Sequence, residues 1–240
     1  MARLPRLYAP GIPQLAHVEF AQAFVDAVDS NPAVELDRLL AWLQTEARQH
    51  KVTVHGWLLL NDRLALLATP AAADSLPRLM QALGRRFATH LRHGRVFAGR
   101  YRSALVEPGR WILPALIWLE SLPVQLKYVE HAENWPWSSA SFHSGNDTTN
   151  ANWTVDHADF WQNGNTPFAR QAAYVLRLHD GLSPSENERI QQALFGQWAL
   201  GGDDFLIRLK GVSNRRLAPA HRGRPKKAAA ARPAPVSALD

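Results

Sequence analysis

The sequence predicts an α+β fold: a ferredoxin-like, split βαβ antiparallel sheet with helices on one face, followed by a small helical C-terminal part and a disordered basic tail. Three observations predict it. Apolar residues alternate between strand and helix periods in the order strand, helix, strand, strand, helix, strand. A polar segment then separates this unit from further helical stretches. Basic residues gather at the end of the chain.

The first part of the chain carries the elements of the split βαβ unit. A proline-rich, extended lead-in opens it. Helices are predicted where apolar residues recur at three- and four-residue intervals, and strands where β-prone apolar runs are bounded by turn residues. The predicted elements are a strand (14–20), a helix (34–50), two strands (52–60 and 64–69) joined at 61–63 with Arg63 at their boundary, a helix (75–91), a strand (101–106) and a buried helix (111–122).

A polar stretch divides the chain. Residues 144–152 contain no apolar side chain larger than Ala, which is typical of a linker. Helical periodicity returns at 167–179, 184–195 and 203–210, as either a small DNA-reading module or simple packing. The predicted organisation is a ferredoxin-like domain (1–143), a linker (144–152), a helical region (153–212) and a basic tail (213–240).

Composition narrows the class of protein. With 240 residues and 46% hydrophobic content, the chain is long enough for one sizeable core. It has no cysteine, no apolar run near the roughly 20 residues of a membrane span and no apolar signal segment, so we expect a cytoplasmic protein without a membrane partner. Nine Lys or Arg against one acid in residues 208–240 favour a polyanion partner such as DNA, although a solvated tail has the same composition.

Several segments occur in a characteristic order. They are Ala2–Arg6 with Pro10-Gly11, then Gly99–Ser103, Trp135–Ser139 and Gly196–Gly201. In this order and approximate spacing they resemble the REP-associated tyrosine transposases, a branch of the HUH single-strand transposases. The resemblance implies a ferredoxin-like catalytic domain. It also implies a strand with a His-hydrophobic-His pair that binds Mg²⁺ or Mn²⁺, and a tyrosine on a facing helix that attacks the scissile phosphate.

The positions that match these functional residues are occupied by other side chains. Arg63 and Ala65 stand where the resemblance implies the two metal ligands, Trp118 where it implies the tyrosine, and Leu122 where it implies an asparagine. A guanidinium has no lone pair for a metal, Ala has no donor atom, and indole has no hydroxyl. We therefore expect no catalytic residue at these positions, no metal site and no cofactor.

Arginines nevertheless suggest that DNA binding is retained. Those at 85–102 have almost no carboxylates near them in sequence, so phosphate contact is favoured over a solvated helix face. Arg222-Gly223-Arg224-Pro225 resembles an AT-hook core, which enters an A·T-rich minor groove. The predicted partner is DNA, as a single-stranded hairpin or an A·T-rich duplex. The predicted contacts are Arg63, Arg85, Arg86, Arg92, Arg95, Arg100, Arg102, Arg215, Arg216, Arg222, Arg224, Lys226 and Lys227.

Two alternatives remain open at this point. One is an active transposase with a relocated nucleophile, for which Tyr128 lies beyond Pro123 and outside the predicted helix. The other is a non-catalytic partner or inhibitory subunit, as a homodimer or as a heterodimer with active relatives. Cleavage of a hairpin would favour the first, and co-purification with an active relative the second.

Overall fold

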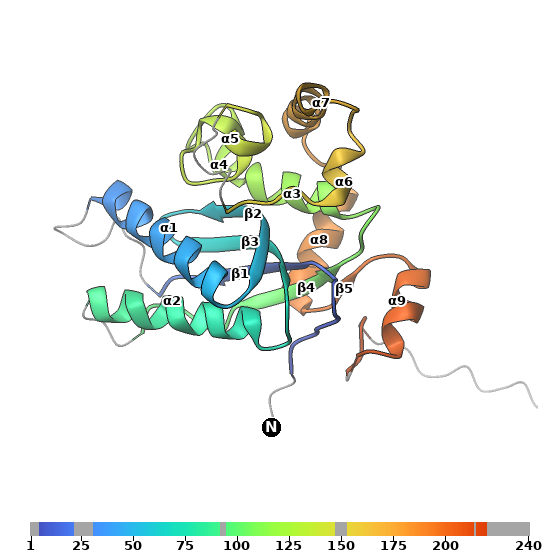
Figure 1. The fold of residues 1–240 in the computed structure, drawn as a ribbon, viewed down its shortest axis with the longest axis horizontal. Coiled ribbons are helices and arrows are strands. Elements are labelled where there is room, and N and C mark those ends of the chain that lie inside the picture. The colour runs from blue at the N-terminus through green and yellow to red at the C-terminus, as the bar shows by residue number, and fades with distance from the viewer. Residues whose placement is uncertain (1–4, 22–30, 92–94, 147–152, 214, 220–240) are drawn as a thin grey trace, which may run out of the picture.

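A computed structural model describes residues 5–21, 31–91, 95–146, 153–213 and 215–219 of the protein. These residues form one five-stranded sheet in the order β2-β3-β1-β4-β5 (Figure 1). The first four strands pair antiparallel, and β5 lies parallel to β4. The predicted α+β, ferredoxin-like class is confirmed. The strands are β1 (Gln14–Glu19), β2 (Val52–Leu59), β3 (Arg63–Pro70), β4 (Arg102–Val106) and β5 (Ala199–Leu200).

Two long helices cover one face of the sheet, as predicted. They are α1 (Pro32–Gln49) and α2 (Ser75–Leu91), which also pack against each other. Helix α1 begins at Asn31, whose side chain accepts a hydrogen bond from the Ala33 amide at 3.1 Å and is followed by a proline at the first helical position. Both helices contribute apolar side chains to one buried cluster with the strands.

The opposite face is covered as well, which the prediction of helices on one face did not include. Helix α3 (Ile112–Glu120) lies over β2 and β3, and α8 (Pro184–Gly196) lies over β4 and β1 (Figure 1). The physical reason is visible in β2 and β3, where apolar residues are nearly continuous instead of alternating, so both faces need cover. Helix α3 approaches so closely that a Cβ on Gly56 would lie 2.3 Å from Leu116 Cδ2.

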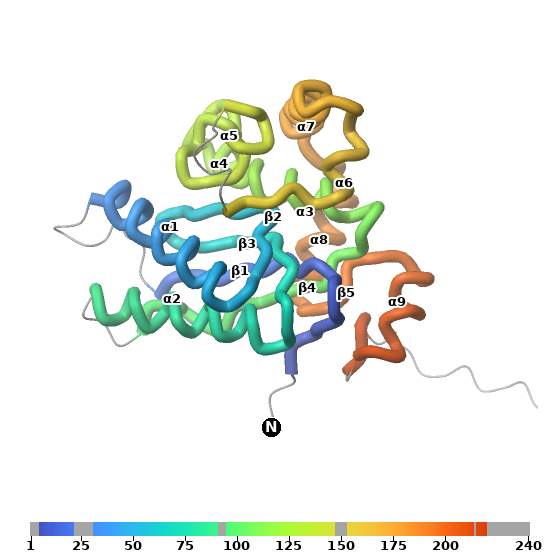
Figure 2. The backbone as a smooth tube through the Cα atoms, in the orientation of Figure 1, coloured from blue at the N-terminus to red at the C-terminus, as the bar shows by residue number. Residues whose placement is uncertain are grey.

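Residues beyond the predicted linker belong to the same core. Of that linker, residues 147–152 lie outside the described residues. Ile190 and Leu194 of α8 share a buried cluster with Leu15 of β1, and β5 extends the sheet. The tube in Figure 2 shows the late α8 segment returning beside the early strands. The other helical segments are α4 (Leu122–Gln125), η2 (Ala132–Asn134), α5 (Ala140–His143), α6 (Ala158–Trp161), α7 (Pro167–Asp180) and α9 (Asp203–Lys210).

A buried carboxylate joins three of these helical segments. Glu120, at the end of α3, is fully buried. Its Oε1 accepts hydrogen bonds from His143 Nδ1 at 2.6 Å and Ser139 Oγ at 2.5 Å, and its Oε2 accepts one from the Tyr174 hydroxyl at 2.7 Å. Three donors compensate a charge that would otherwise be costly to bury.

Among the described residues no helix is both long and apolar enough to cross a membrane.

We predict that Glu120→Ala costs about 3–5 kcal/mol of unfolding free energy, because it leaves a buried imidazole and two hydroxyls without their acceptor. Tyr174→Phe removes only one donor and should cost about 1.5–3 kcal/mol. Urea denaturation of both variants measures the difference. If Glu120→Ala costs no more than Tyr174→Phe, the carboxylate does not organise these helices.

Candidate functional site: the apolar cluster around Trp118 and the Arg6 groove

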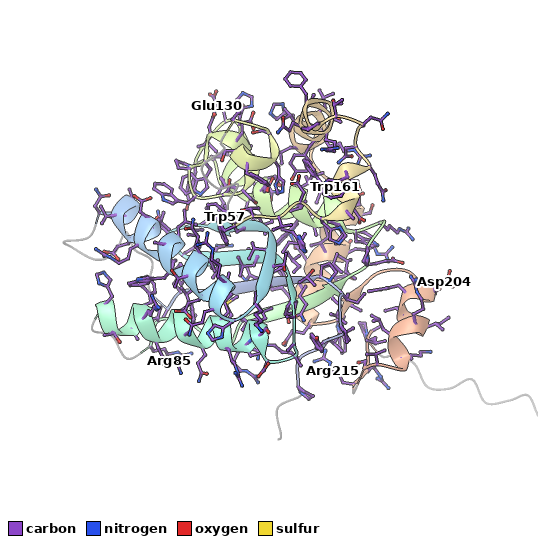
Figure 3. All side chains as sticks on the ribbon, viewed as in Figure 1. Trp57, Arg85, Glu130, Trp161, Asp204 and Arg215 are labelled. Atoms are coloured by element: carbon purple, nitrogen blue, oxygen red, sulfur yellow. The ribbon has the colours of Figure 1, made fainter. Side chains whose placement is uncertain are left out.

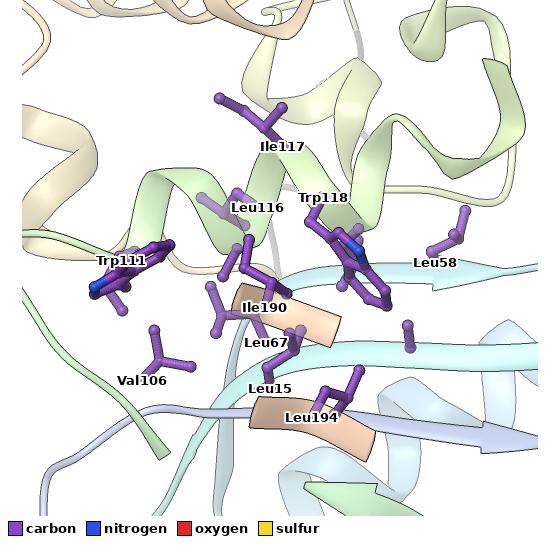
Figure 4. Close-up of a cluster of buried hydrophobic side chains, with 14 of the residues drawn as sticks. Leu15, Leu58, Leu67, Val106, Trp111, Leu116, Ile117, Trp118, Ile190 and Leu194 are labelled. Atoms are coloured by element: carbon purple, nitrogen blue, oxygen red, sulfur yellow. The ribbon is translucent and has the colours of Figure 1, made fainter. Parts of the chain in front are cut away.

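The positions that the resemblance assigns to metal binding and catalysis do come together. Ala65 on β3 is fully buried, and Trp118 on α3 is 3% exposed, in the same apolar cluster. Leu122 packs against that cluster from the first residue of α4. Figure 4 shows the Trp118 ring directed from α3 toward the sheet, between side chains of β2 and α8. These three positions are therefore occupied by apolar side chains in one cluster.

Arg63, the first residue of β3, is hydrogen-bonded to its neighbour Asp62. Its Nε and Nη2 donate to the two carboxylate oxygens of Asp62 at 2.8 and 2.5 Å. This hydrogen bonding raises the pKa of Arg63 and lowers the pKa of Asp62. The paired carboxylate offsets much of the positive charge that Arg63 would otherwise present to a phosphate.

His17 is a buried residue of this site that the sequence analysis did not single out. It lies on β1, paired across the sheet with Ala65 on one side and Arg102 on the other. Its ring meets the Phe195 ring edge-on, with centroids 5.6 Å apart. Burial, and then the charge of Arg63, lowers the pKa of His17 to about 4. A single histidine in an apolar strand has no sequence pattern that would mark it.

These residues do not form a metal site. Ala65 offers no donor atom and Arg63 is a cation, so His17, paired with Ala65 across the sheet, supplies a single imidazole. In the part of the chain that the structure describes, one group of three histidine or carboxylate side chains is close enough to hold a metal ion. It consists of His131, Glu133 and His179, away from β3.

Several of the arginines predicted to bind DNA are held by the protein itself. Arg86 pairs with Glu46 at 2.7 Å, Arg95 donates to the carbonyls of residues 97 and 98, and Arg102 donates to that of residue 195. Arg215 donates to the carbonyls of residues 5 and 197 and lies over the Trp198 ring. The predicted contacts Arg92, Arg222, Arg224, Lys226 and Lys227 lie outside the described residues.

Three exposed arginines, Arg85, Arg100 and Arg216, have no ion-pair partner among the described residues. In Figure 3, Arg85 and Arg215 lie on the side of the molecule opposite Glu130. The predicted cationic residues thus divide into those bound within the fold and those free to meet a ligand.

Arg100 borders a surface hollow that we call the Arg6 groove. The hollow has a volume of about 430 Å³ and adjoins a second one of about 330 Å³, and both are lined by Arg6, Pro77 and Tyr101. The Arg6 guanidinium lies 3.6 Å from the centre of the Tyr101 ring and donates to the Tyr101 carbonyl at 3.0 Å. Phe97 adds an aromatic wall. Guanidinium and aromatic groups together suit a nucleic-acid strand, because they contact phosphates and stack on bases.

The buried state of His17 predicts a measurable acid sensitivity. Because the folded pKa is about 4 and the unfolded pKa about 6.5, the unfolded chain binds an extra proton between these values. The free energy of unfolding should therefore fall by up to about 3 kcal/mol as the pH drops through this window, and the loss should level off below it. His17→Gln should make the decline shallower, measured by urea denaturation from pH 7 to 4, with His90→Gln as the control. An unchanged slope would contradict a neutral, buried His17.

Comparisons with known proteins give a structural likeness without a sequence match. No model of a protein family and no curated protein matches the chain. A REP-associated tyrosine transposase bound to a REP hairpin is similar in structure, with a TM-score of 0.53 and 14% identity, over 65% of this chain and 93% of that one. A Deinococcus radiodurans protein assigned as a transposase reaches a TM-score of 0.33 at 19% identity, over 54% of this chain and 96% of that one. This TM-score is too low for a structural inference. The chain thus has the fold of a REP-associated tyrosine transposase.

Proposed function

We propose that this protein is a DNA-binding relative of the REP-associated tyrosine transposases that has lost the ability to cut DNA. One observation carries the loss of cutting: Ala65 and Trp118, at the positions that the resemblance assigns to a metal ligand and the nucleophile, are both buried in one apolar cluster. Metal-assisted strand transfer needs a hydrated, charged site open to a phosphate. A ligand cannot enter here without displacing the core.

DNA binding is supported by a surface on the other face of the sheet, beside α2. The Arg6 groove combines a stacked guanidinium, two aromatic rings and the exposed Arg100. Arg85 and Arg216 are further exposed cations. The structural neighbour was solved with a REP hairpin, which makes a hairpin the first ligand to test. An A·T-rich duplex is the second, through the basic residues 222–227. We place this activity in the cytoplasm of a bacterium.

The competing function is that of an active transposase with a relocated nucleophile, for which Tyr128 is the candidate residue. Tyr128 is 47% exposed and stacks on Trp135 with ring centroids 5.4 Å apart. An exposed phenol is a chemically sensible nucleophile. It would still lack the metal ligands of its relatives. An inhibitory subunit that pairs with an active relative, or with itself, is the third candidate.

The deciding experiment incubates the purified protein with a labelled REP-type hairpin and a linear single strand, with Mg²⁺ or Mn²⁺ present. We expect a salt-sensitive shift on a native gel and no cleavage or covalent adduct on a denaturing gel. An adduct that disappears in Tyr128→Phe would overturn the proposal in favour of the relocated nucleophile. Absence of both signals would favour the inhibitory subunit, which co-purification with an active relative would then test.

The arginine variants test where the DNA lies. Arg100→Ala should weaken hairpin binding about tenfold and reduce the slope of log K against log salt by about 1, as expected for one phosphate contact. Arg63→Ala is the matched control, and its effect should be smaller because Asp62 already offsets that charge. Fluorescence anisotropy at several salt concentrations measures both. If Arg63→Ala weakens hairpin binding more than Arg100→Ala does, the strand lies near Arg63 and not in the Arg6 groove.

A further inference from the structure

Two histidines and a glutamate converge from separate parts of the chain. His131 and Glu133 lie in the segment around η2, and His179 lies in the last turn of α7. Each offers one ligand atom, and these atoms lie within 4.8 Å of one another. His179 Nε2 and Glu133 Oε1 are 3.0 Å apart, and the two imidazole centroids are 5.0 Å apart. None of these residues belongs to the Arg6 groove or to the replaced catalytic positions.

The glutamate has an unused ligand atom. Glu133 Oε2 is buried and has no hydrogen-bond partner among the described residues, while Oε1 meets His179. A buried carboxylate oxygen without a donor is unfavourable, and a cation removes that cost. The set of two imidazoles and one carboxylate is the mixed nitrogen and oxygen ligation that zinc and related transition metals prefer.

We propose that His131, Glu133 and His179 bind one transition-metal ion of the zinc class. Zinc ligands lie about 2.0–2.2 Å from the ion, so the three groups must draw together slightly. The imidazoles are free to do so, because both histidines are exposed. They also line a hollow of about 430 Å³, shared with Ser121, Gln125 and Glu130, which has room for a water molecule as the fourth ligand.

The ion would act as a clamp within the fold. It would connect the η2 segment, which follows α4, to α7, which follows the predicted linker. Figure 1 shows α4 and α7 above α3, and residues of both line the same hollow. Binding to the folded state alone would stabilise the protein by mass action. This role is independent of strand cutting and of DNA binding.

The test uses the full chain without a histidine tag, treated with EDTA and then titrated with Zn²⁺, with Mg²⁺ as a hard-cation comparison. We expect one Zn²⁺ per chain by calorimetry, and a rise in Tm of about 5–10 °C when free Zn²⁺ is a hundredfold above its Kd. Mg²⁺ should give neither. Cu²⁺ bound at the same site should show nitrogen coupling from two imidazoles in its electron paramagnetic resonance spectrum.

Variants decide whether these residues are the ligands. His179→Ala and Glu133→Ala should each lower the affinity for Zn²⁺ at least about tenfold. His90→Ala is the matched control, since His90 is a partly exposed histidine that also pairs with a glutamate, Glu35, and it should leave binding unchanged. Absence of Zn²⁺ binding, or equal affinity in His179→Ala and the parent protein, would overturn the proposal. Hairpin binding by His179→Ala should equal that of the parent, which separates this test from that of DNA binding.

Discussion

The arrangement on the α3 side of the sheet depends on one buried carboxylate. Glu120 ends α3 and is satisfied by a serine and a histidine from the segment around α5 and by a tyrosine from α7. Burial alone would lower the pKa of His143, but the charge of Glu120 outweighs it and raises that pKa. The contribution of His143 to stability is therefore fully present below its unfolded pKa, and it declines as the pH rises through its higher folded pKa. Removal of the carboxylate leaves all three donors without this acceptor, so the three segments depend on Glu120.

That constraint explains the state of the replaced catalytic positions. With the end of α3 held by Glu120, Trp118 lies two residues earlier with its ring directed toward the sheet, in the same apolar cluster as Ala65. The indole N–H of Trp118 is buried without a hydrogen-bond partner among the described residues, which costs folding free energy. A core selected only for stability would avoid this cost. A histidine introduced at position 65 would lie in the same apolar cluster as Trp118. On the proposed function, several coordinated changes would separate this site from a working metal centre.

The fold could be predicted because its signals are local, whereas most of the site could not. Helical and strand periods give the element order, and the continuous apolar runs in β2 and β3 already imply cover on both faces. The residues at positions 63, 65, 118 and 122 could be named only through the resemblance. The buried His17, the stacking of Arg6 on Tyr101 and the ion pair of Arg86 with Glu46 depend on sheet register and tertiary packing, which no spacing along the chain encodes.

The arginines illustrate why a cluster in sequence overstates a binding surface. Arg86, Arg95 and Arg102 are close in the chain, yet each donates to a group of the protein, and one of the three faces a carboxylate. An arginine bound to a carbonyl keeps its charge and spare donors, so it can still attract a phosphate. One bound to a carboxylate contributes little net field. Of the predicted contacts in the described part of the chain, Arg85, Arg100 and Arg216 have no ion-pair partner among the described residues, and of these three Arg100 lines the aromatic groove.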